Sequence, residues 1–96
     1  MTAPTATQPV RIVLVDDHPL MREGLAEVLR REPDLQVCGE AEDRAQGLIV
    51  IKATKPDLVI VDLALKNSHG LELIKDLVLI YPKLRILVVS MHDEFV

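Results

Sequence analysis

Three short apolar runs, each followed at once by an acidic or hydroxyl residue, constrain the fold of this chain more than any other feature. The runs occupy residues 12–15, 58–61 and 86–89, and the residues that follow them are Asp16, Asp17, Asp62 and Ser90. Strands that are apolar at every position are typical of a parallel sheet that helices cover on both faces. Because ligands of such sheets bind outside the carboxyl ends of the strands, we expect three carboxylates and one hydroxyl in a single crevice.

The gathered carboxylates predict a site for a hard divalent cation. Three like charges within a few ångströms repel one another strongly at a low effective dielectric constant. Mg²⁺ relieves this repulsion, since it keeps several waters and takes one or two carboxylates directly. One carboxylate can then act as a nucleophile toward a phosphoryl group. Helix capping by Asp16 and Asp17 is the simpler alternative, and Asp62 weakens it because Asp62 ends a separate strand.

Size and charge narrow the class of protein. The chain has 96 residues and a formal net charge of -4, which fits one small domain and argues against a nucleic-acid surface. Its single cysteine, Cys38, excludes an internal disulfide and fits a reducing compartment. No segment resembles a secretion signal, and Asp62 interrupts the longest apolar region, so neither export nor membrane insertion is expected. We expect a cytoplasmic protein with a disordered leader over residues 1–9 and one domain over residues 10–96.

Periodicity and turn residues predict alternating strands and helices. The strands are expected over residues 11–15, 35–39, 58–62 and 85–89. The first helix is expected to begin at Pro19 and to be stopped by Pro33, and the other two are expected over residues 43–53 and 70–80. In the first helix, Leu25, Val28 and Leu29 are expected to face the core and Arg22 the solvent. The chain stops six residues after Ser90. A doubly wound domain that ends on its fourth strand leaves that strand uncovered, so we expect a truncated domain.

Three separated motifs carry a family resemblance. Residues 13–19 read VLVDDHP, residues 56–62 read PDLVIVD, and residues 88–94 read VVSMHDE. In this order and spacing they resemble the receiver domain of bacterial response regulators, and most closely its NarL/FixJ type. The resemblance implies a flavodoxin-like receiver fold and a phosphoacceptor that takes its phosphoryl group from a histidine kinase. It also implies transcriptional control by the intact protein rather than turnover of a substrate.

The same resemblance assigns roles to individual residues. Asp62 would be the phosphoacceptor, and Asp17 and Asp62 would bind Mg²⁺ directly. Asp16 would help through water, and the backbone carbonyl of Ala64 would be a further ligand. Ser90 would be the switch hydroxyl, which hydrogen-bonds the new phosphoryl oxygen.

The chain also departs from the family pattern. Family members usually carry proline where this chain has Lys66, and a solvated lysine at the rim of the acidic pocket is expected there. His18 and His92 are expected to rim the acidic pocket. The family's lysine on a fifth strand would lie beyond Val96, so we expect slower phosphorylation than in an intact receiver. The DNA-binding helices of NarL/FixJ proteins would also follow Val96, so no contact with DNA is expected from these residues.

Two rival functions and one interaction property stay open. An aspartate-nucleophile phosphatase of the haloacid dehalogenase kind needs a second Asp two residues after the nucleophile, and this chain has Ala64 there. The second rival is an interaction or dimerisation module whose acidic pocket is silent. The apolar runs over residues 48–51 and 77–81 exceed what one helix face buries, and with the uncovered fourth strand they predict self-association.

Overall fold

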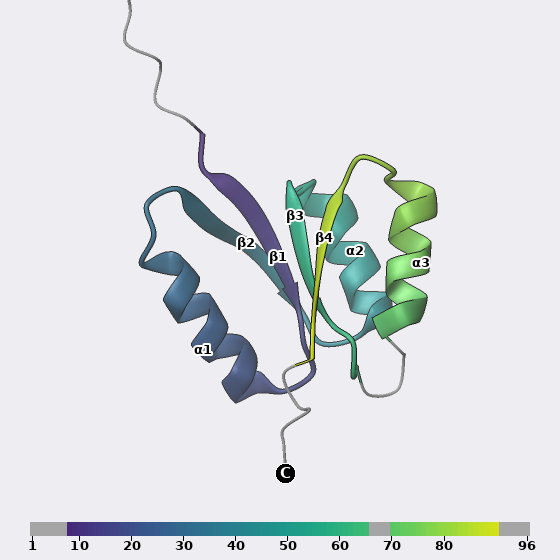
Figure 1. Ribbon diagram of the computed structural model, residues 1–96, viewed down its shortest axis with the longest axis horizontal. Coiled ribbons are helices and arrows are strands. Elements are labelled where there is room, and N and C mark those ends of the chain that lie inside the picture. The colour runs from purple at the N-terminus through teal and green to yellow at the C-terminus, as the bar shows by residue number, and fades with distance from the viewer. Residues whose placement is uncertain (1–7, 66–69, 91–96) are drawn as a thin grey trace, which may run out of the picture.

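The computed structural model describes residues 8–65 and 70–90, which form a parallel sheet between two layers of helices. In chain order the elements are β1 (Val10–Val15), α1 (Pro19–Arg30), β2 (Leu35–Ala41), α2 (Arg44–Thr54), β3 (Leu58–Asp62), α3 (Gly70–Ile80) and β4 (Arg85–Val89). The sheet has the order β2-β1-β3-β4, and every strand pair is parallel. Helix α1 covers one face, and α2 and α3 cover the other (Figure 1). The predicted doubly wound sheet is confirmed.

The two central strands divide their side chains between two cores, because successive side chains of a strand point to opposite faces. The buried valines of β1 and β3 pack under α2 and α3 around Ile51, Leu73 and Leu77. Ile12, Leu14 and Ile60 pack on the other face around Ala26 of α1. This double burial holds the carboxyl ends of β1 and β3 in place, and both strands end on acidic residues.

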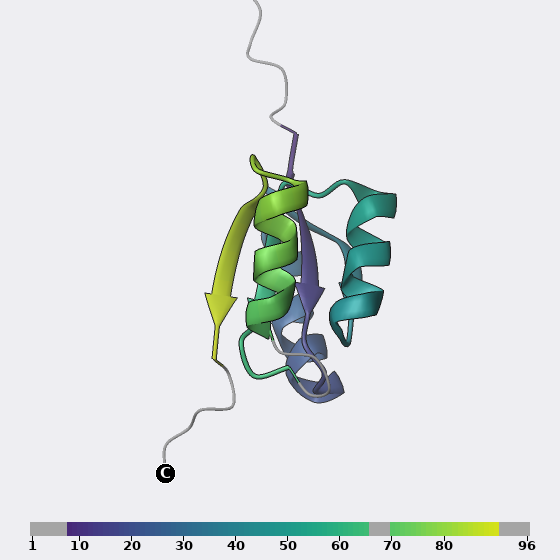
Figure 2. The same ribbon diagram turned by 90° about the vertical axis from the view of Figure 1, so that its right-hand side faces the viewer.

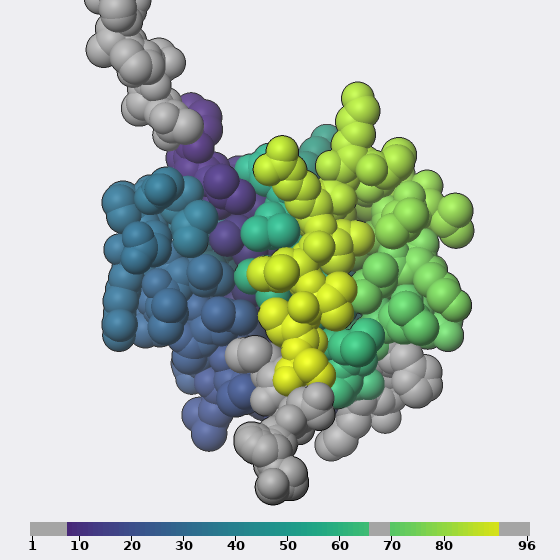
Figure 3. Space-filling view, in the orientation of Figure 1, coloured from purple at the N-terminus to yellow at the C-terminus, as the bar shows by residue number. Residues whose placement is uncertain are grey.

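Strand β4 is more exposed than an apolar strand inside a covered sheet. Leu87 is 50% exposed and Val88 is 44% exposed. In Figure 3, β4 runs across the surface between α1 and α3. Full burial of the run over residues 86–89, as its apolar pattern predicts, is therefore wrong for Leu87 and Val88, whereas the expectation of an uncovered fourth strand agrees with their exposure. The reason is that the helices pack mainly on β1, β2 and β3 rather than on β4.

Helix α1 begins with Pro19 and turns a different face to the sheet than the one predicted. Ala26 is fully buried, whereas Val28 is 54% exposed, so the prediction that Val28 lies in the core is wrong. The buried positions follow the spacing of Arg22, Leu25, Ala26 and Leu29, which lie on one side of a helix with 3.6 residues per turn. Val28 lies on the flank of this face.

An ion pair joins the two helices on the opposite face of the sheet. The Arg44 Nε donates to Asp76 Oδ2 at 2.7 Å, and the Arg44 Nη2 donates to Asp76 Oδ1 at 3.0 Å. This hydrogen-bonded carboxylate raises the pKa of the Arg44 guanidinium. The bidentate pair fixes the start of α2 against the middle of α3.

Candidate functional site

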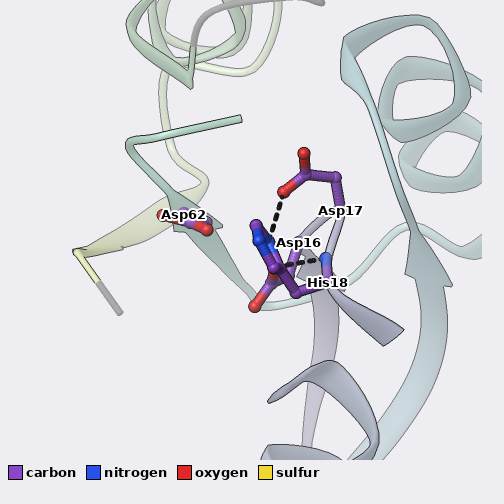
Figure 4. Close-up of side chains that lie close together, drawn as sticks. All are labelled: Asp16, Asp17, His18 and Asp62. Atoms are coloured by element: carbon purple, nitrogen blue, oxygen red, sulfur yellow. Dashed lines mark hydrogen bonds and ion pairs between the residues drawn. The ribbon is translucent and has the colours of Figure 1, made fainter. Parts of the chain in front are cut away.

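The carboxyl ends of β1 and β3 bring four side chains into one group. Asp16, Asp17, His18 and Asp62 each offer one ligand atom, and these atoms all lie within 4.8 Å of one another. Figure 4 shows Asp62 at the end of one strand and the other three residues after the neighbouring strand. The cluster of three carboxylates that the strand ends predict is present.

Asp62 is the most deeply buried member of this group. It is 0% exposed, and its Oδ1 accepts a hydrogen bond from the Ala64 backbone N–H at 3.0 Å. The Leu63 N–H donates to the Val89 carbonyl at 2.8 Å, which fixes the turn to the end of β4. The chain itself therefore orients the Asp62 carboxylate, by a side-chain to backbone bond two residues ahead.

Asp16 connects the end of β1 to the start of α1. It is 5% exposed, and its Oδ1 accepts a hydrogen bond from the His18 backbone N–H at 2.8 Å. Its own N–H donates to the Ala41 carbonyl at 3.0 Å, so β2 holds the residue as well. These contacts shape the turn on which Asp17 sits.

His18 lies beside the acidic cluster, with part of its side chain open to solvent. Its Nδ1 is 2.9 Å from Asp17 Oδ1 and 3.6 Å from Asp16 Oδ1, and the side chain is 49% exposed (Figure 4). His18 occupies the N-cap position of α1, yet its side chain makes no capping hydrogen bond. The imidazole is thus at the mouth of the site and in contact with a carboxylate.

Arg22 supports the site from α1, although its side chain was predicted to face the solvent. Its Nη1 donates to the backbone carbonyl of Asp16 at 2.5 Å, and its Nε donates to Glu40 Oε1 at 3.0 Å. Its side chain is only 19% exposed. The guanidinium joins α1 to the ends of β1 and β2. The signal that could have found it is the spacing of Arg22 with Leu25, Ala26 and Leu29, because it places Arg22 on the buried face.

Of the other predicted site residues, the structure describes Ser90 and Ala64 but not Lys66 and His92. Ser90 directly follows Val89, which pairs with Asp62 in the sheet, so Ser90 lies at the same edge as the carboxylates. Ala64 is in the turn that contacts Asp62. Lys66 and His92 lie outside the described residues, and their predicted rim positions stay predictions.

The donor set suits a hard cation. Carboxylate oxygens are the ligands that Mg²⁺ and Ca²⁺ prefer, whereas an imidazole nitrogen suits softer metals. Buried carboxylates generally have a counter-charge or bind a metal. Three aspartates within 4.8 Å, two of them buried, therefore fit a divalent cation held by oxygen ligands, with His18 as a neighbour of Asp17.

Comparison with known proteins gives one family. The family model described as the response regulator receiver domain matches residues 12–96. The chain is 34% identical over 85 residues to the transcriptional regulatory protein DegU of Brevibacillus brevis, and 37% identical over 85 residues to the DNA-binding transcriptional activator DevR/DosR of Mycobacterium tuberculosis. Each match covers 88% of this chain, but only 36% and 39% of the two relatives.

A solved structure confirms the fold. The signal receiver domain of the response regulator NarL from Mycobacterium tuberculosis superposes with a TM-score of 0.82 at 36% identity. The superposition covers 92% of this chain and 71% of that chain. The flavodoxin-like receiver fold implied by the three motifs is confirmed.

Proposed function

The chain belongs to the response regulator receiver domain family, and from this membership we propose that it accepts a phosphoryl group on Asp62 with the help of Mg²⁺. The observation that supports this proposal most is the cluster of three aspartates within 4.8 Å, in which Asp62 is wholly buried. The donor would be a histidine kinase.

Asp62 acts as the nucleophile in this proposal. A carboxylate oxygen attacks the phosphorus of a phosphohistidine, and the new O–P bond forms as the N–P bond breaks. The electron pair of the broken bond stays on the imidazole nitrogen, which then takes a proton from solvent. The hydrogen bond from the Ala64 N–H to Oδ1 at 3.0 Å holds the carboxylate in one orientation during the attack.

Asp17 and Asp62 would hold the metal directly, Asp16 through water, and the Ala64 carbonyl would complete the protein ligands. When bound, Mg²⁺ neutralises charge on the phosphoryl oxygens. The contact of His18 with Asp17 Oδ1 holds this partly buried carboxylate near the other two. Arg22 keeps the Asp16 carbonyl, and so the peptide that leads into Asp17, in a fixed position.

Ser90 would donate its hydroxyl to a phosphoryl oxygen after transfer. Ser90 follows Val89, which pairs with Asp62, so a small movement at the end of β4 would bring its hydroxyl to the phosphoryl group. Phosphorylation would thus act as a switch, in which a local change of charge favours one of two positions of Ser90. Lys66 and His92 would line the entrance.

The proposed role of the site in the whole protein rests on the relatives of the chain. The chain spans about two fifths or less of the length of DegU and DevR/DosR, and their names describe them as transcriptional regulators. We propose that phosphorylation of Asp62 controls transcription through the rest of the protein, in the cytoplasm. None of the helices in residues 8–65 and 70–90 combines the length and the hydropathy needed to cross a membrane.

Acetyl phosphate labelling tests the proposal against its rivals. With Mg²⁺ present, mass spectrometry of the chain should show one stable phosphoryl group on Asp62. Steady hydrolysis of acetyl phosphate without a stable label would favour the phosphatase, although Ala64 offers no acid or base for it. Complete absence of label and of hydrolysis would favour a silent interaction module.

Magnesium binding gives a prediction that does not depend on phosphorylation. Titration of Mg²⁺ followed by NMR should shift the backbone amides of Asp17, Asp62 and Ala64. The Asp17→Asn variant should bind at least about tenfold more weakly, because it loses one direct carboxylate ligand. Asp34→Asn is the matched control, since Asp34 is exposed and uses only its backbone carbonyl in the described structure. Equal affinities for the two variants would remove Asp17 from the ligand set.

Self-association is expected from the exposed apolar side chains of β4. Leu87 is 50% exposed on a strand whose outer edge pairs with no other strand in residues 8–65 and 70–90. Leu87→Lys should reduce association in light scattering, because a lysine on an edge strand opposes strand pairing. Leu20→Lys, at an 82% exposed position of α1, is the control. If the unsubstituted chain stays a monomer over the concentration range in which the variants are compared, β4 is not an association surface.

A further inference from the structure

A second concave site lies at the end of the sheet opposite the aspartates. It is formed where β1, β3 and β4 begin and where α2 and α3 end, at the upper end of the molecule in Figures 1 and 2. The cavity has a volume of about 1020 Å³. Its apolar wall includes Ile51, Leu58, Tyr81 and Leu84. Sites for small molecules are concave and mostly apolar, with volumes of about 300–1,000 Å³, so this one is at the upper limit.

Four cations surround this apolar wall. Lys52 and Lys55 come from the end of α2, and Lys83 and Arg85 come from the turn before β4 and its first residue. Asp57 is the single carboxylate of the lining. The charged side chains of the lining are therefore mainly positive, whereas the chain as a whole has a net charge of -4.

The contacts of the described residues leave this positive charge available. In residues 8–65 and 70–90, none of the four cations lies within 4.0 Å of a carboxylate oxygen as an ion pair. The carboxylate of Asp57 accepts a hydrogen bond from the Arg11 backbone N–H at 2.9 Å. Its charge is therefore partly satisfied by the backbone of β1.

Helix-dipole compensation does not account for these cations. Lysines are favourable near the negative end of a helix, which would be a sufficient reason for Lys52 and Lys55. However, Arg11 already serves the end of α2, because its Nη1 donates to the carbonyls of Thr54 at 2.6 Å and Lys55 at 2.9 Å. Arg85 begins a strand, where no such dipole acts. The helix dipole therefore leaves at least Arg85 unexplained.

We propose that this pocket, the basic pocket, binds a small anionic amphiphile, that is, a carboxylate or phosphate head on an aliphatic or aromatic body. The body would lie against Leu58, Tyr81 and Leu84, and the head would be held between the lysines of α2 and the cations before β4. Cations from two parts of the chain line this one pocket, so several of them can form charge-assisted hydrogen bonds with a single compact anionic head group.

The basic pocket is separate from the aspartate cluster but joined to it by β3. Leu58, the first residue of β3, lines the pocket, and Asp62 is the last residue of the same strand. Four steps at about 3.3 Å place the two ends roughly 13 Å apart. Binding can therefore be measured without Mg²⁺ and without phosphorylation, and its outcome does not depend on the proposed role of Asp62.

Octanoate is the probe for this proposal, with uncharged octanamide as its matched control. A ligand of this size is expected to bind with a Kd on the order of a millimolar. Titration of the isotopically labelled chain in NMR should give saturable shifts at Ile51, Leu58 and Leu84. Octanamide should bind at least about fivefold more weakly, because it lacks the charge that the lysines attract.

Two pairs of variants separate charge from apolar contact. Lys83→Glu should weaken octanoate binding roughly fivefold, whereas Lys75→Glu, at an exposed position of α3 outside the pocket, should leave it unchanged. Ile80→Ser should weaken binding through the lining, whereas Leu79→Ser should not, since Leu79 does not line the pocket. Ile80 and Leu79 are 56% and 82% exposed, so both serine variants should stay folded.

Several outcomes would overturn the proposal. Equal affinity for octanamide would mean that the cations do not recognise the head group. Shifts centred on Leu87 and Val88 would mean that octanoate binds the exposed strand β4 instead. Shifts at the pocket that depend on protein concentration alone would assign it to a second copy of the chain. An acidic peptide that binds there while octanoate does not would assign it to a protein partner.

Discussion

Asp62→Asn should abolish acetyl phosphate labelling of the chain, because an amide oxygen is not a nucleophile toward phosphorus under these conditions. Asparagine has the same shape as aspartate, and its side-chain oxygen can still accept the hydrogen bond that the Ala64 N–H donates at 3.0 Å. The change also removes one of three like charges within 4.8 Å. Without Mg²⁺ the variant should therefore be at least as stable as the unsubstituted chain.

The control for this experiment is Asp34→Asn, which changes an exposed carboxylate far from the cluster and should label normally. Labelling is followed by mass spectrometry and stability by urea denaturation of the same samples. A stable label on the Asp62→Asn chain would mean that another residue accepts the phosphoryl group. If the variant loses its label because it does not fold, the denaturation curve will show this. Asp62→Glu would then be compared, because it keeps the carboxylate but moves it by one methylene group.

The strands and their ends could be predicted from the sequence because burial on both faces requires uninterrupted apolar runs. The predicted bounds of β4 and α3 agree with the structure at both ends. Strand β2 was predicted to end at Gly39 but continues to Ala41. Its last part includes Glu40, a charged residue that carries no strand signal, and the contact of Glu40 with Arg22 explains its place there.

The candidate site was predicted as a set of carboxylates, but the contacts that support it were not. Polarity alone assigns Arg22 to the solvent, whereas its spacing with Leu25 and Leu29 places it on the buried face. The partners of Arg22 include the backbone carbonyl of Asp16, and a sequence pattern cannot show such a contact. In the same way, the position of His18 before Pro19 suggested a rim residue but did not reveal its contact with Asp17, whose Oδ1 is 2.9 Å from the His18 Nδ1.

The exposure of β4 shows a further limit of sequence patterns. An apolar run indicates that a strand can be buried, but whether the strand is buried depends on which helices cover it. Leu87 and Val88 are apolar like Val59 and Ile60, yet only the pair on β3 lies between two strands and under helices on both faces. The same reasoning explains why the basic pocket was not expected, since its lining is brought together at the ends of β1, α2, β3, α3 and β4.

Gly70→Ala should destabilise the fold and damage the aspartate cluster in one step. A Cβ on Gly70 would lie 2.5 Å from the Asp62 carbonyl oxygen and 2.7 Å from the Leu63 Cα. Both atoms belong to the backbone turn that positions Asp62, so a flexible side chain cannot relieve the clash. We expect a loss of about 1–3 kcal/mol in the free energy of unfolding, as for other overpacked sites. The start of α3 or the turn after β3 must move.

Gly24→Ala is the matched control, because a Cβ there meets no atom within 4 Å. Gly24 is an exposed interior residue of α1, so alanine should raise the free energy of unfolding by up to about 1 kcal/mol. Urea denaturation measures both effects, and a Mg²⁺ titration reports on the site. Since the turn carries the Ala64 N–H that bonds Asp62, Gly70→Ala should weaken Mg²⁺ binding and Gly24→Ala should not. Unchanged stability and Mg²⁺ affinity in Gly70→Ala would contradict the close packing of α3 against the end of β3.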